Sequence, residues 1–168
     1  ETIVCLSAYF LAFLHYNINP KELFQNNYRY FDRHHTKDQN YISESGHIFT
    51  KAEQMEVLAS VQASWFLLLV ASQAVHVFLC RSSIDSIFKY NFFSNKLSLI
   101  GVVTAAALSG LIVYYPYLQQ ELETGPVPVP VVFSAFSISV VLLVAWSESR
   151  KIILRNFPSS TVSKYLHW

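Results

Sequence analysis

Four long stretches of this chain contain no Asp, Glu, Lys or Arg, and no other feature constrains its fold as strongly. They cover residues 2–20, 57–80, 97–120 and 124–147. A membrane-spanning helix needs roughly 20 mostly apolar residues. The last three stretches have 24 residues each, and the first is shorter. Each stretch is therefore predicted to cross a bilayer as a helix.

The stretches predict an all-α integral membrane domain that fills residues 1–168. We place its four transmembrane helices at about 2–19, 57–80, 97–118 and 130–147. The first helix is expected to be truncated, because its apolar run begins at the edge of the chain. The chain opens with Glu1 and has no basic flank there, which is not typical of a signal peptide. We interpret this end as a cut inside a larger protein.

Composition agrees with a membrane domain and argues against several soluble classes. Only 14% of the residues are charged, whereas a soluble domain has about 25%. The net charge of +1 is too small to favour nucleic-acid binding. Both cysteines, Cys5 and Cys80, lie in apolar runs, so a disulfide-stapled external domain is not expected.

The polar connectors predict how the helices are oriented. The 81–96 connector and the C-terminal tail are basic, whereas the 121–129 connector is acidic and the long 21–56 loop is mixed. Because basic loops stay in the cytosol, the first two are placed there and the other two on the opposite side. In the long loop, Thr50 and Glu53 are typical of a capping box at a helix start.

Few polar side chains lie at membrane depth, and these are the candidates for an ion path. Gln73 and His76 lie three residues apart, so they share one face of the second predicted helix. His15 lies near the end of the first helix and Thr104 within the third. Such groups are often functional, although interhelical hydrogen bonding is an equally good explanation for Gln73 and His76.

Other chemistry is weakly indicated. His34, His35 and His47 have no third ligand placed by sequence, so no metal site is predicted. Ser86, in the basic connector, is a candidate phosphorylation site on a weak signal. The residues show no nucleophile–base pair and no phosphate-binding loop, so no catalytic site is expected in this segment.

Several short motifs, in order, resemble the C-terminal membrane domain of sodium/potassium and proton/potassium P-type ATPase alpha subunits. They are YFLAFLHYNINP (9–20), SQAVHVFLCRSSIDSIF (72–88), NKLSLIG (95–101), YYP (114–116) and SESRKIILRNFP (147–158). The resemblance covers nearly the whole chain, and IILR with the preceding Arg150 and Lys151 is its most specific part. It implies that the four spans are the seventh to tenth transmembrane helices of a pump.

The resemblance also implies departures at ion-binding positions. The family's eighth helix has Asp where this chain has His76, and its ninth has two adjacent Glu where this chain has Thr104 and Ala105. Its seventh helix has Glu at the position of His15. Those acids contribute to the third sodium site and a proton path in sodium pumps. The expectation is a divergent member with altered stoichiometry, or one that no longer pumps sodium.

A partner and cofactors are implied in the same way. The family docks its beta subunit at a Ser-Tyr-Gly-Gln motif in the loop after the seventh helix, where this chain has Glu44, Ser45, Gly46 and His47. The segment is expected to brace the pump's remaining helices in the plasma membrane, with its C-terminus in the cytosol. ATP and Mg would bind elsewhere in the parent chain.

Rival interpretations remain open at the level of sequence. A free-standing four-helix scaffold or adaptor would need its own start signal. A small channel or carrier would need polar residues along several spans, and the last two offer only Ser and Thr. The related calcium pumps share the fold, but the IILR run and the long loop favour the alpha-subunit branch. The 21–56 loop could also be a solvated surface without a partner.

Overall fold

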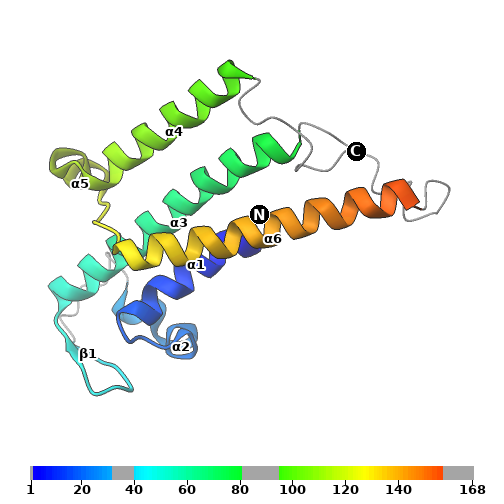
Figure 1. The fold of residues 1–168 in the computed structure, drawn as a ribbon. Helices are drawn as coiled ribbons and strands as arrows, with labels where there is room; N and C mark the ends of the chain where they lie inside the picture. The colour runs from blue at the N-terminus through cyan, green and yellow to red at the C-terminus, as the bar shows by residue number, and fades with distance from the viewer. Residues whose placement is uncertain (1, 32–39, 81–94, 157–168) are drawn as a thin grey trace.

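The computed structural model describes residues 2–31, 40–80 and 95–156, which are mostly helical (Figure 1). The elements are α1 (Thr2–His15), α2 (Pro20–Tyr30), β1 (Tyr41–Ile42), β2 (Ile48–Phe49), α3 (Lys51–Leu79), α4 (Lys96–Tyr114), α5 (Pro116–Leu122) and α6 (Val129–Asn156). Within those ranges, α3, α4 and α6 are long and apolar enough to span a membrane, and α1 is a shorter apolar helix. The all-α membrane class is confirmed, with a two-stranded hairpin added.

Helices α1, α3 and α6 pack together as a bundle, and α4 lies against α3 to one side (Figure 1). The contact between α1 and α3 is made by small residues. Ala8 and Ala12 on α1 are completely buried. Ser64 on α3 donates a hydrogen bond to the Ala8 carbonyl oxygen at 3.5 Å. Small side chains let two helix backbones approach closely, as in membrane bundles generally.

Helix α1 ends in a Schellman motif. Asn17 adopts the left-handed conformation with φ 57°, and asparagine tolerates it better than most residues. The Ile18 amide donates to the Phe13 carbonyl and the Asn17 amide to the Leu14 carbonyl, both at 3.0 Å. Ile18 and Phe13 are fully buried in one apolar cluster. The chain then turns, and Pro20 begins α2.

The 21–56 loop is structured where it is described. Strands β1 and β2 pair antiparallel, with Tyr41 opposite Phe49. The predicted capping box is confirmed: the Thr50 side chain accepts from the Glu53 amide, and the Glu53 side chain accepts from the Thr50 amide. The buried Gln54 side chain also donates to the Phe49 carbonyl at 3.0 Å. The hairpin is therefore fastened directly to the start of α3.

The third and fourth apolar helices end differently from the expected spans. Helix α4 stops at Tyr114, before the expected end at residue 118, because Pro116 cannot continue the hydrogen-bond ladder and instead begins α5. Helix α6 begins at Val129, with Pro130 in its first turn. It runs to Asn156, beyond the expected end at Ser147. Helices α2 and α5 and the hairpin lie toward the same end of the molecule (Figure 1).

Candidate functional site

An apolar groove lies between α3 and α4. Its volume is about 450 Å³. It lies along the half of α3 farther from the hairpin and the first half of α4. Its lining residues are Leu69, Val70, Gln73, Ala74, Val77, Ser98, Gly101, Val102 and Ala105. Apart from Gln73 and Ser98 the lining is apolar or small, so the groove suits a hydrocarbon chain better than a hydrated ion.

The four predicted intramembrane polar candidates lie at separate places. Gln73 lines the groove. His76 is half-buried on α3, and its Nε2 lies 3.0 Å from the sulfur of Cys80. Thr104 is exposed on α4, outside the groove lining, and His15 is exposed at the end of α1. The structure therefore does not bring the four together, although Gln73 and Ala105 border one cavity.

The contact between Cys80 and His76 was not predicted from the sequence. The Cys80 thiol and the His76 imidazole lie within hydrogen-bond distance of each other. The signal in the sequence is their spacing, because residues four apart on a helix face each other.

The remaining candidates from the sequence concern metal binding and phosphorylation. Within the described ranges, no group of three or more His, Cys, Asp and Glu side chains could hold a metal ion. His34, His35 and the proposed phosphorylation site Ser86 lie outside the described residues.

The predicted docking residues form the exposed tip of the hairpin. Glu44, Ser45, Gly46 and His47 are all exposed. The turn is closed by the Ser43 amide, which donates to the His47 carbonyl at 2.9 Å, and by the Gly46 amide, which donates to the Ser43 carbonyl at 2.8 Å. Gly46 has φ 81°, which only glycine adopts without strain.

Glu22 on α2 holds this hairpin in place. Its carboxylate accepts hydrogen bonds from the Tyr41 hydroxyl and, at 3.4 Å, from the Glu44 amide. Burial, and then the hydrogen bond to Glu22, raise the pKa of Tyr41 well above its usual range. A raised tyrosine pKa means that this contact stabilises the fold below about pH 10 and is lost as the pH rises past that value.

A polar chain joins α1, α3 and the connector before α6. The Tyr16 hydroxyl donates to Ser60 Oγ at 3.1 Å, and Ser60 Oγ donates to the Pro126 carbonyl at 3.0 Å. Nothing in the sequence pattern pairs these residues, since Ser60 and Pro126 are 66 positions apart.

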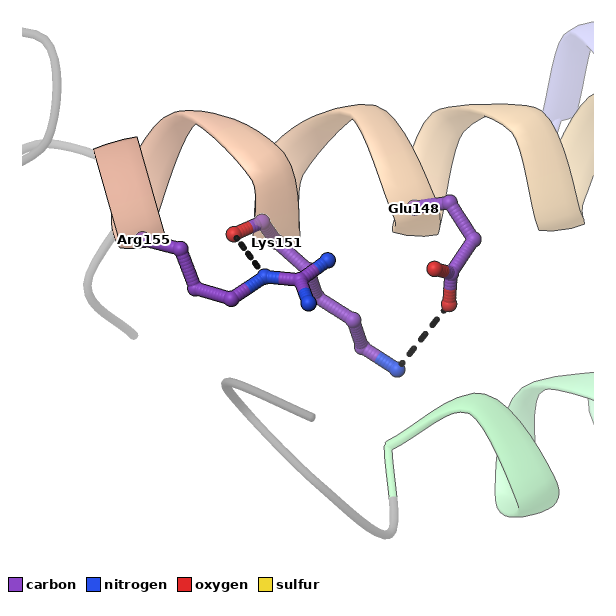
Figure 2. Close-up of polar contacts among 3 residues, drawn as sticks. All are labelled: Glu148, Lys151 and Arg155. Atoms are coloured by element: carbon purple, nitrogen blue, oxygen red, sulfur yellow. Dashed lines mark hydrogen bonds and ion pairs between the residues drawn. The ribbon is translucent and has the colours of Figure 1, made fainter. Parts of the chain in front are cut away.

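The far end of α6 carries a buried cation (Figure 2). Lys151 is 1% exposed, and its Nζ lies 3.7 Å from the Glu148 carboxylate. Arg155 folds back and donates from Nε to the Lys151 carbonyl at 3.4 Å. Burying an unpaired ammonium would cost several kcal/mol. The sequence predicts that Lys151 belongs to a basic cytosolic end, and the structure adds that its side chain is buried there.

Comparison with known proteins decides the family. The family model described as "Cation transporting ATPase, C-terminus" matches residues 1–153. The chain belongs to this family. Similar curated proteins include the sodium/potassium-transporting ATPase subunit alpha-2 of Gallus gallus, 28% identical over 123 residues, and that of Bos taurus, 26% identical. The subunit alpha-4 of Rattus norvegicus is 24% identical.

The match to this cation-transporting ATPase family confirms the resemblance drawn from the motifs. Each of these alignments covers 73% of the chain but only 12% of the relative, so the chain spans about one-eighth of the length of the curated relatives it matches. This chain is therefore an integral membrane domain of the alpha-subunit type. The family match and the apolar helices agree on this point.

Proposed function

We propose that this cation ATPase C-terminal domain supports the ion-binding helices of a P-type pump and docks a beta-type subunit through its hairpin. The pump would be of the sodium/potassium or proton/potassium type, in the plasma membrane, with the C-terminus of this domain in the cytosol. The docking part of the proposal rests on the hairpin tip, which is exposed and is held in place by hydrogen bonds to α2 and α3.

The apolar helices bury little of their surface within this domain, which supports the bracing role. In the candidate spans, 11% of the α4 window and 22% of the α6 window are buried. Large apolar side chains such as Phe133, Val141 and Trp146 are more than half exposed. These surfaces meet lipid or the remaining helices of the pump. Residues that bind ATP and Mg would belong to other parts of the protein.

The docking role is supported by rigidity as well as exposure. Glu22 fixes the hairpin from α2, and Gln54 fixes it from α3. The tip therefore presents Glu44, Ser45 and His47 in one geometry, which lowers the entropy lost when a partner binds.

A charge reversal at the tip tests docking. In the full-length protein, Glu44→Arg is expected to reduce co-purification of a co-expressed beta-type subunit, and Glu121→Arg on the exposed helix α5 is the matched control. Equal recovery of the subunit with both variants, and with the unmodified protein, would contradict docking at the hairpin.

ATP hydrolysis tests the pump itself and its ion dependence. The full-length protein in membranes is assayed with sodium and potassium varied separately. Activity that needs both ions would show that His15, His76 and Ala105 are tolerated replacements. Activity without sodium, or none, would support a divergent member. His76→Asp with Ala105→Glu, the latter facing the groove, is then expected to increase sodium dependence, and unchanged dependence would count against the divergence hypothesis.

A further inference from the structure

Cys80 places an exposed thiol beside an imidazole at the end of a membrane helix. It is the C-cap of α3, and its thiol is free and exposed. Its amide donates to the His76 carbonyl at 2.9 Å, which keeps the two residues one helical turn apart. Its sulfur lies 3.0 Å from His76 Nε2. An imidazole at this distance can take the proton of the thiol as the sulfur attacks.

The lining of the apolar groove reaches to within one helical turn of Cys80. Val77 and Gln73, which line the groove, precede Cys80 by three and seven residues and so lie on the same face of α3. The lining continues to Leu69, about 16 Å along the helix axis from Cys80 at 1.5 Å per residue. A chain attached to Cys80 can therefore lie along α3 within the groove.

We propose that Cys80 is an S-acylation site and that its long-chain fatty acyl group occupies the groove between α3 and α4. Juxtamembrane cysteines are the usual positions of this reversible modification. The groove is almost entirely apolar, and its lining on α3 ends at Val77, three residues before Cys80. This proposal goes beyond pump support and docking, and it requires the end of α3 that carries Cys80 to face the cytosol.

The chemistry balances with a long-chain acyl-coenzyme A thioester as donor. The Cys80 sulfur attacks the thioester carbonyl carbon as His76 takes the thiol proton. A new carbon–sulfur bond forms at Cys80, and the bond between the acyl carbon and coenzyme A breaks. The leaving thiolate receives the proton from His76, so free coenzyme A is released and His76 is restored. No oxidation occurs.

The chain contains its own control thiol. Cys5 is 1% exposed on α1, inside the bundle, with its sulfur 3.9 Å from Ser72 Oγ. It has neither access nor a neighbouring base in that contact. Acylation is therefore expected at Cys80 and not at Cys5.

Metabolic labelling tests the site. The full-length protein is expressed in cells fed an alkyne fatty acid, and hydroxylamine-sensitive label is measured on the purified protein. Cys80→Ser is expected to lose one acyl group per chain, whereas Cys5→Ser keeps it. His76→Asn is expected to lower the rate of labelling severalfold. Equal label on Cys80→Ser and the unmodified protein would overturn the proposal.

Two further measurements separate the parts of the proposal. A membrane-impermeant maleimide applied after hydroxylamine should label Cys80 only when the cytosolic side is exposed, and labelling from the other side would overturn the required orientation. Hydroxylamine should lower the melting temperature of the unmodified protein. It should not lower that of Ala105→Phe, in which the phenyl ring fills the groove. An equal drop in both would mean that the acyl chain lies elsewhere and ordinary lipid fills the groove.

Discussion

At the scale of single residues, the connector before α6 packs closely against α3 where the two cross. A Cβ added to Gly125 would lie 2.9 Å from the Ser60 amide nitrogen and 3.2 Å from Ala59. The atom that it meets is backbone, so it cannot move aside as a flexible side chain would. Glycine is needed at position 125 because a side chain would prevent this close approach, and not because the backbone adopts a positive φ. The same crossing carries the hydrogen bond from Ser60 to Pro126.

Gly125→Ala is therefore expected to destabilise the domain by about 1–3 kcal/mol, the usual cost of overpacking. The free energy of unfolding in mixed detergent micelles measures it. Gly110→Ala is the matched control, because a Cβ there meets nothing within 4 Å, and alanine favours a helix over glycine by about 1 kcal/mol. A neutral Gly125→Ala would show that the connector does not rest on α3 as described.

At the scale of elements, the start of α3 was predictable from local sequence, whereas the ends of α4 and α6 were not. Capping depends on residues within one turn of each other. The Thr50 and Glu53 side chains each accept a hydrogen bond from the other residue's backbone amide, as their spacing predicts. Pro116 was the missed signal: it was included in the third predicted span, although a proline opens a helix more readily than it continues one.

Thr50→Ala is expected to destabilise the start of α3 by about 1 kcal/mol, since the Glu53 amide loses its acceptor. Amide hydrogen exchange at the first turn of α3 should accelerate, together with exchange in the hairpin that the turn supports. Thr50→Ser retains the hydroxyl and should behave like the unmodified protein. Unchanged exchange in Thr50→Ala would mean that tertiary contacts, and not the cap, hold this end.

At the scale of the whole molecule, the bundle depends on small residues between α1 and α3. Ala8 is completely buried, and Ser64 bonds to its carbonyl oxygen. Neither residue contributes much apolar area. Their value lies in letting two helices approach closely, which is how apolar helices associate where lipid is as apolar as the side chains.

Ala8→Leu is expected to force α1 away from α3 and to destabilise the domain by about 1–3 kcal/mol or more. Denaturant titration measures the loss, and increased maleimide labelling of Cys5 should accompany it, because that thiol is buried at the same interface. Leu14→Phe enlarges a half-exposed side chain on the same helix and should change neither quantity. Unaltered labelling in Ala8→Leu would contradict the close packing.

The sequence by itself determined the membrane class, the apolar helices and the capping box, because each depends on composition or on residues within a few positions. The motif order likewise identified the family. Only the tertiary structure decided that Gln73 and Ala105 border one groove while Thr104 lies outside it, and that Lys151 is buried. Apolar periodicity cannot settle these points, because a helix that is apolar all round gives no sign of which side meets lipid and which meets protein. Helix rotation and close approach are set by packing between distant segments, such as Ser60 with Pro126.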